Sequence, residues 1–319
     1  MKMIPLVLTL LTVAMPAAAQ SNPRPADRKA VLWVDPGDVA SKDLFWGSGA
    51  QDRAPKAPFT FVEEDTDGTQ PKVVVRDANG REWTAKFGEE VHSSIAASRI
   101  VWALGYAADE TYYVESGTIA GATGLKTAAK AIGADGTFNK SAFRLRDAKS
   151  ERAKERWTFE KNPFRGSKEL SGLAILMTML CNWDIQGERN NRILDHGGQD
   201  LYIVSDVGAT FGKMGAFPAP RSKWTLEDFQ KEEFIEKVDG GMIDLDYEGY
   251  GGINKVPLEH AAWFAGIASR LTDKQIADAF RAAGASQAEI DGFSARLRAK
   301  ILELQKAVPT SRIALSRDE

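Results

Sequence analysis

The strongest constraint on the fold is a change of pattern along the chain, from strand-like segments to helical ones. Between Phe59 and Phe87, the runs "FTFVEED", "KVVVRD" and "REWTAKFG" are rich in β-branched and aromatic residues, which favour strands. The "ANG" before the third run is an Asn-Gly hairpin signal. We therefore expect three consecutive antiparallel strands in this region.

A helix is predicted directly after these strands, in "EEVHSSIAASRIVWALGY". Apolar residues recur there at close to helical spacing, at Val91, Ile95, Ile100, Val101 and Leu104. The pattern ends at Gly105, a typical helix stop. "ETYYVESGTI" then predicts another strand, and "SAFRLRD" a further strand or short edge. The Ala-, Gly- and Lys-rich stretch 126–140 between them indicates a linker or exposed loop.

The second half of the chain is mostly helical in pattern. "ELSGLAILMTMLCNW" is apolar nearly all round, as in a helix buried at the centre of a lobe. "LYIVSD" predicts a short strand, and Pro257 to Val308 three or four helices. The order predicts an α+β, two-lobed architecture. We expect a loosely ordered lead-in over 20–57, an N-lobe with an antiparallel sheet and a helix over 58–120, and a mostly helical C-lobe over 121–319.

The N-terminus has the three parts of a cleaved secretory signal peptide. Lys2 supplies a basic start, an apolar run extends from Ile4 to Met15, and an Ala-rich segment ends the pattern. We expect a signal peptide over 1–19, cleavage after Ala19, and a periplasmic or secreted protein. The apolar run is shorter than the roughly 20 residues that span a bilayer, so no transmembrane anchor is expected.

Composition excludes several functional classes. The formal net charge of −3 carries no basic footprint for nucleic acid. Cys181 is the single cysteine, which excludes an internal disulfide, and its apolar surroundings predict a buried, inert thiol. His92, His196 and His260 are too far apart to show zinc-like spacing.

Two basic residues of the strand region are candidate anion ligands. The loop "TDGTQPK" holds Gly68, whose turn can direct backbone N–H groups at an anion, and Lys72 adds positive charge beside it. Lys86 ends the third strand, and strand alternation places it on the face opposite Trp83 and Phe87. Each feature has an ordinary alternative, since most such turns bind nothing and strand lysines are usually solvated.

Carboxylates and amides after the buried helix are candidates for acid–base and metal roles. Asp184 follows that helix at a rim fixed by core packing, which suits a group that accepts a hydroxyl proton. Asn190, Asn191 and Asp206 offer hard oxygen donors of the kind that Mg²⁺ takes, with Gly208 allowing a sharp change of direction. The alternatives are a turn at the asparagines and a cap or Asx-turn at Asp206.

The joint order of these features resembles the protein-kinase-like fold. "DGTQPKVVV" resembles the phosphate loop of HipA-like serine/threonine kinases. "NWDIQGERNN" followed by "VSDVGATFG" is similar to the Asp, Asn and Asp-x-Gly set of HipA-like and phosphatidylinositol 3- and 4-kinase-like enzymes. The resemblance extends from Phe59 to Gly212.

The resemblance implies a role for each candidate. The phosphate loop would be lined by Gly68, Thr69, Gln70 and Lys72. Lys86 would bind the nucleotide phosphates, and Asp184 would face the acceptor hydroxyl. Asn190 or Asn191, with Asp206, would hold Mg²⁺ or Mn²⁺. The implied function is an exported kinase-like phosphotransferase that uses Mg-ATP to modify a protein or small-molecule hydroxyl.

Two departures from the kinase pattern favour an alternative, a catalytically inactive kinase-fold module that binds a partner in the cell envelope. The usual interval from the catalytic Asp to the metal Asn is five residues and ends here on Arg189, whereas Asn190 and Asn191 lie six and seven residues away. The helix acid that pairs with the strand lysine is also unclear, because Glu89 and Glu90 stand only at the first turn. A third interpretation is a structural envelope protein whose aspartates cap local turns. The expected partners are a nucleotide and a hydroxyl-bearing acceptor or an envelope protein.

Overall fold

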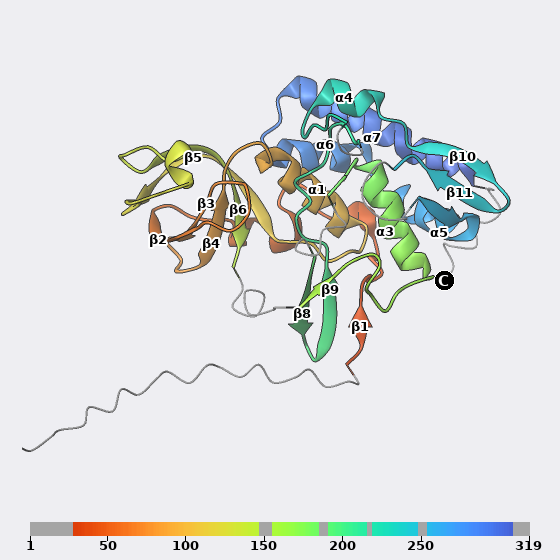
Figure 1. Ribbon diagram of the computed structural model, residues 1–319, viewed down its shortest axis with the longest axis horizontal. Coiled ribbons are helices and arrows are strands. Elements are labelled where there is room, and N and C mark those ends of the chain that lie inside the picture. The colour runs from red at the N-terminus through yellow and green to blue at the C-terminus, as the bar shows by residue number, and fades with distance from the viewer. Residues whose placement is uncertain (1–27, 147–154, 185–190, 216–218, 248–253, 309–319) are drawn as a thin grey trace, which may run out of the picture.

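The computed structural model describes residues 28–146, 155–184, 191–215, 219–247 and 254–308. The predicted signal peptide lies outside these ranges, and so does Asn190. The described chain forms a strand-rich lobe and a helical lobe, which lie side by side in Figure 1. The predicted α+β, two-lobed architecture is therefore confirmed.

The strand-rich lobe is a closed barrel with the spatial order β2-β3-β4-β6-β5. Its strands are β2 (Phe59–Asp65), β3 (Lys72–Arg76), β4 (Glu82–Lys86), β5 (Thr111–Ala120) and β6 (Thr137–Leu145). Neighbouring strands pair antiparallel except β2 and β5, whose parallel pairing closes the barrel. Large apolar side chains such as Trp83 and Phe143 fill its interior, as expected for a barrel too small to enclose water.

The hairpin between β3 and β4 confirms the Asn-Gly signal. One carboxylate oxygen of Asp77 accepts hydrogen bonds from the backbone N–H groups of Asn79 and Arg81, both at 2.9 Å. Gly80 has a φ of +77°, a conformation that glycine adopts without steric cost. The turn sets the register in which Lys72 lies opposite Lys86.

The barrel continues to Leu145, so the expected lobe boundary at residue 120 falls inside it. β6 pairs with both β4 and β5, and these long-range pairings are not visible in local composition. The stretch 126–140 holds a short 3₁₀ helix, η4 (Ala128–Lys130), and the start of β6. The carboxylate of Glu64 on β2 binds this stretch, accepting from the N–H of Lys126 at 2.7 Å and of Ala128 at 2.8 Å.

The lead-in, expected to be loosely ordered, packs on the helical lobe in its described part. Arg28 forms ion pairs of 2.6 Å with Asp195 and 2.7 Å with Asp200. The side chain of Gln275 donates at 2.6 Å to the carbonyl of Val39, and Leu44 is fully buried. The segment contains β1 (Ala30–Val31) and three 3₁₀ helices, η1 (Val39–Ser41), η2 (Gly47–Gly49) and η3 (Gln51–Arg53).

Helices make up most of the second lobe, and α1 joins it to the barrel. The helices are α1 (Val91–Ala103), α3 (Lys168–Met179), α4 (Leu226–Lys231), α5 (Leu258–Ala268), α6 (Asp273–Ala282) and α7 (Gln287–Ala307). α1 packs against β5 and β6 on one side and α6 on the other. The three helices after Pro257 confirm the predicted helical tail, and Thr272 and Ser286 form capping boxes at two of their N-termini. Within the described ranges, no helix has both the length and the apolarity needed to cross a membrane.

Two small sheets complete the helical lobe. One has the order β1-β9-β8-β7, with β7 (Arg156–Trp157), β8 (Asn191–His196) and β9 (Gln199–Ile203). The other comprises β10 (Ile235–Asp239), β11 (Met242–Leu245) and β12 (Lys255–Pro257), which the sequence pattern did not predict. The antiparallel β8–β9 hairpin extends below the lobes in Figure 1 and carries the chain toward Asp206.

The binding of the 126–128 loop by Glu64 predicts a pH-dependent loss of stability. Backbone hydrogen bonds from Ala128 and then Lys126 lower the pKa of Glu64 from 4.5 to about 2. A lowered carboxyl pKa stabilises the fold fully above the unfolded-state value, and this contribution disappears as the pH falls through the folded-state value. Glu64→Gln should therefore lower the melting temperature at neutral pH, and the difference from wild type should shrink between about pH 4.5 and pH 2.

Thermal unfolding across this window is the measurement, with Glu236→Gln as the control because Glu236 is an exposed residue of β10. If the difference in melting temperature between wild type and Glu64→Gln stays constant as the pH falls, the assigned role of the Glu64 carboxylate is contradicted.

Candidate active site

A cavity of about 760 Å³ lies between the barrel, α1 and the end of the β8–β9 hairpin. The structure brings most of the sequence-predicted site residues to its wall: Gly68, Thr69, Gln70, Lys72, Lys86, Asp184 and Asp206. Six basic and five acidic side chains line it: Lys72, Lys86, Arg144, Arg156, Arg192 and Lys223, with Asp67, Glu90, Asp109, Asp184 and Asp206. The charges are thus nearly balanced.

Lys86 stands between two carboxylates at the centre of the cavity. Its ammonium donates to Glu90 and lies 3.6 Å from a carboxylate oxygen of Asp206. Burial alone would lower the pKa of Lys86, but the charges of Asp206 and Glu90 outweigh it and raise the pKa. Burial likewise opposes ionisation of Glu90, but Lys86 and Lys223 keep the pKa of Glu90 below its ordinary value. Both groups are therefore charged at neutral pH.

Glu90 is the helix acid that the sequence left unclear. It is the N-cap residue of α1, and the turn at Gly88, with a φ of +98°, directs it back toward Lys86. A negative charge is also favourable at a helix N-terminus. Protein kinases place a strand lysine against a carboxylate of the following helix, and an Asp-x-Gly aspartate nearby. Lys86, Glu90 and Asp206 have this arrangement. The arrangement of these three side chains is protein-kinase-like.

The Asp-x-Gly turn is shaped by close contact with Glu90. Asp206 has a φ of +48°, so the left-handed residue is the aspartate and not Gly208. A Cβ atom on Gly208 would lie 2.7 Å from a carboxylate oxygen of Glu90, a distance at which one group must move. The hydroxyl of Ser93 donates to the carbonyl of Gly208 at 2.6 Å. The glycine is therefore required for close approach to α1.

The predicted phosphate loop borders the same cavity. Gly68 has a φ of +76°, and the ammonium of Lys72 donates to the carbonyl of Asp67 and lies 3.4 Å from Asp65. Lys72 and Lys86 are direct cross-strand neighbours. Like charges placed opposite each other on neighbouring strands are unfavourable, so an anion between them would relieve the repulsion. This geometry suits a phosphate group.

Asp184 reaches the cavity from the opposite side, five residues after the end of α3. Its backbone N–H donates at 3.0 Å to the side chain of the buried Asn182. The neighbouring Trp183 donates from its indole N–H to the carbonyl of Ser222 at 3.3 Å. These contacts hold the segment at the cavity rim.

Of the two asparagine candidates, the structure describes only Asn191, which does not line the cavity. Asn190 lies outside the described residues. Asn191 begins β8, is fully buried, and its side-chain oxygen accepts from the backbone N–H of Ser205 at 3.3 Å. That bond orients the residue before Asp206, and Asn191 is not among the lining residues.

Asp206 fits a magnesium ion because Mg²⁺ is usually bound by one or two carboxylates together with substrate phosphates. The side chain of Asp206 is 41% exposed and faces the cavity that the phosphate loop borders. In the part of the chain that the structure describes, no three His, Cys, Asp or Glu side chains gather into a metal site of their own. Substrate phosphates would supply further ligands to a metal bound at Asp206.

Sequence reasoning missed several residues of the cavity. Thr84 stands two positions before Lys86 on the same strand face, so alternation could have found it. The others required knowledge of strand pairing or of distant contacts: Ser94, Ser98, Asp109, Thr111, Arg144, Arg156, Arg192 and Lys223. Arg144 lies opposite Thr84 on β6 and donates to its hydroxyl at 3.2 Å.

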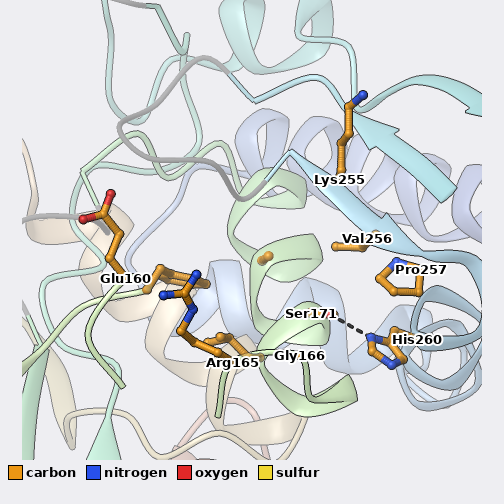
Figure 2. A pocket seen from close by; sticks show the side chains of 11 residues that line it. Glu160, Arg165, Gly166, Ser171, Lys255, Val256, Pro257 and His260 are labelled. Carbon is orange, nitrogen blue, oxygen red and sulfur yellow. Dashed lines mark hydrogen bonds between the residues drawn. The ribbon is translucent and has the colours of Figure 1, made fainter. Parts of the chain in front are cut away.

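A second cavity, of about 420 Å³, lies in the helical lobe and shares no lining residue with the first. Figure 2 shows it beside α3 and the junction of β12 with α5, where the hydroxyl of Ser171 and Nδ1 of His260 form a hydrogen bond of 2.9 Å. Among the described residues, none of the sequence-predicted site residues lines this second cavity.

No protein-family model matches the chain. A comparison with curated proteins finds no relative. Among solved structures, the chain is similar to one described as the crystal structure of the Golgi casein kinase, with a TM-score of 0.41 and 11% sequence identity. The similarity covers 82% of this chain and 75% of that chain.

The Lys86–Glu90 pair should be strongly coupled to the fold. Removing one partner of a buried ion pair leaves an uncompensated charge, so Glu90→Gln and Lys86→Met should each destabilise the protein. The double variant should lose less than the sum of the two, with a coupling on the order of 1–3 kcal/mol in denaturant unfolding.

The exposed pair Glu227–Lys231 is the matched control, because it has the same four-residue separation on a solvated helix. Glu227→Gln and Lys231→Met should show almost no coupling. Equal coupling at the two pairs would contradict the proposed importance of burial.

Proposed function

We propose that this protein is a kinase-like phosphotransferase, which transfers the terminal phosphoryl group of Mg-ATP to a hydroxyl group. The observation that carries the proposal is the convergence of Lys72, Lys86, Asp184 and Asp206 on one cavity. Phosphoryl transfer requires little covalent chemistry from the protein, and depends on positioning and on neutralising negative charge. A cavity that brings two lysines and two aspartates together can position the reactants and can neutralise negative charge.

Each side chain then has a defined role. Lys86 and Lys72, with the backbone N–H groups around Gly68, bind the phosphates. Asp206 holds the magnesium ion, which when bound neutralises phosphate charge. Asp184 orients the acceptor hydroxyl and accepts its proton as the new oxygen–phosphorus bond forms. The bond between the terminal phosphorus and the β,γ-bridging oxygen breaks, and ADP leaves with that electron pair.

We further propose that the protein acts outside the cytoplasm, in the periplasm or as a secreted protein. The basic start, apolar run and Ala-rich end of residues 1–19 support this location. The acceptor would then be a protein or small molecule of the cell envelope or its surroundings.

A nucleotide-binding module without turnover is the second candidate, and the position of Asn191 favours it. The side-chain oxygen of Asn191 accepts from the backbone of Ser205, so it is already engaged as a structural group. Loss of one metal ligand would weaken catalysis more than it weakens nucleotide binding.

Thermal unfolding with ATP and Mg²⁺ or Mn²⁺ tests nucleotide binding. Ligand at about 100 times its dissociation constant stabilises a protein by roughly 2.7 kcal/mol, which corresponds to several degrees at about 2–4 °C per kcal/mol. The metal-dependent shift should disappear in Asp206→Ala, whereas Asp239→Asn, an exposed change at the end of β10, should retain it. Absence of any shift in the wild-type protein would refute nucleotide binding.

Conversion of ATP to ADP with a panel of hydroxyl-bearing acceptors separates the two candidates. Asp184→Asn should lower the transfer rate by about 10²- to 10⁴-fold, because it removes the proton acceptor. It should keep the ATP-dependent thermal shift, since Asp184 lies on the acceptor side. A wild-type protein that binds ATP but transfers phosphate to no acceptor would favour the binding module.

A further inference from the structure

Lys223 belongs to a cluster of four charges at the centre of the cavity. Its ammonium lies 2.5 Å from one carboxylate oxygen of Glu90, while Lys86 binds the other oxygen. Asp206 completes the cluster through its 3.6 Å contact with Lys86. Two positive and two negative charges therefore balance without ligand. Lys223 is not one of the residues that the kinase resemblance implies.

The backbone on both sides of Lys223 is anchored. On one side, the backbone N–H of Ser222 donates to the carbonyl of Lys213 at 3.2 Å, and the Ser222 hydroxyl accepts a hydrogen bond from the N–H of Lys213 at 2.8 Å. On the other side, the N–H of Trp224 donates to the carbonyl of Thr210 at 3.0 Å, and its ring packs on Phe293 with centroids 4.7 Å apart. The Lys223 side chain is only 16% exposed. The ammonium is thus held in place before any ligand binds, as electrostatic catalysis requires.

Lys223 lies between the donor and acceptor sides of the cavity. Toward the donor side it shares Glu90 with Lys86. Toward the acceptor side, its ammonium is 5.4 Å from the ring centroid of Trp183, the residue next to Asp184. A phosphoryl group moving from a nucleotide at Lys86 to a hydroxyl at Asp184 would pass beside this ammonium.

We propose that Lys223 binds the transferring phosphoryl group and neutralises its charge during transfer. This inference rests on the proposed phosphotransferase function. A lysine ammonium has three N–H donors, so Lys223 can keep its bond to Glu90 and still donate to a phosphate oxygen. The bonds that form and break are those of the proposed reaction, and Lys223 itself gains and loses no proton.

Selectivity for a triphosphate over a diphosphate is the measurement that isolates this role. Calorimetric titration of the full mature protein would compare the Mg²⁺ complexes of ADP and of the β,γ-imido analogue of ATP. In Lys223→Met, affinity for the analogue should fall about 10- to 100-fold, as expected for loss of one charged hydrogen bond, while affinity for ADP changes little. Lys223→Arg should restore most of the difference.

Lys213→Met is the matched control, because Lys213 is an exposed lysine of the same segment. If Lys223→Met weakens both nucleotides equally, Lys223 acts only by holding Glu90, and the inference is overturned. The inference is also overturned if Lys223→Met binds both ADP and the ATP analogue with the affinities of the wild-type protein. If Lys223→Met does not fold, Lys223→Gln is judged by the same ratio. Failure of the wild-type protein to bind either nucleotide would instead refute the proposed function itself.

Discussion

The carboxylate of Glu90 is the point on which the arrangement of the two lobes depends. It accepts from Lys86 at the end of a barrel strand and from Lys223 in the helical lobe, and it stands at the N-terminus of the helix that packs against both. Burying charged groups costs several kcal/mol per ion unless each finds a well-placed partner. Because Glu90 has one lysine on each oxygen, the barrel, α1 and the segment around Lys223 must keep one relative arrangement.

The turn at Asp206 follows from the same contact. Gly208 must lie against Glu90, so the chain enters from β9 and reverses within a few residues. The left-handed backbone that this requires falls on Asp206, a residue type that adopts it more readily than most. Unfavourable backbone of this kind often marks functional sites. Here it directs the carboxylate toward Lys86, where the ion pair offsets part of the cost.

Local patterns in the sequence predicted many of the helices and strands, whereas long-range contacts determine how the strands pair. The β3–β4 hairpin, α1, α3 and the helical tail follow from turn signals, periodicity and caps that act within a few residues. Closure of the barrel by β2 and β5 joins Phe59 to Ile119, and no local signal specifies that pairing.

The candidate site likewise combines residues that local patterns predict with residues that only the tertiary fold brings in. Lys86 ends β4 and Asp206 follows the end of β9 by three residues, and the patterns of both strands are visible in the sequence. Glu90 was considered but not assigned, because four residues separate it from Lys86 across a strand–helix turn, where helical spacing has no meaning. Lys223 lies 133 residues from Glu90, so only the tertiary fold brings them together. The side chain of Asn191 faces the backbone of Ser205 because the β8–β9 pairing sets its direction, which composition does not reveal.

If the cavity binds a metal and a nucleotide, as we propose, its balanced charges make the two binding events interdependent. Without ligand, Asp206 is a partner of Lys86, and Lys86 therefore attracts a phosphate less than a free lysine would. When Asp206 is engaged by a divalent cation, as we propose, its charge no longer competes for Lys86, and the ammonium is available to the phosphate. By linkage, the factor by which the metal raises nucleotide affinity equals the factor by which the nucleotide raises metal affinity. On the proposed function, the single ion pair of 3.6 Å between Lys86 and Asp206 would make the cavity a poor site for either ligand alone and a better one for both together.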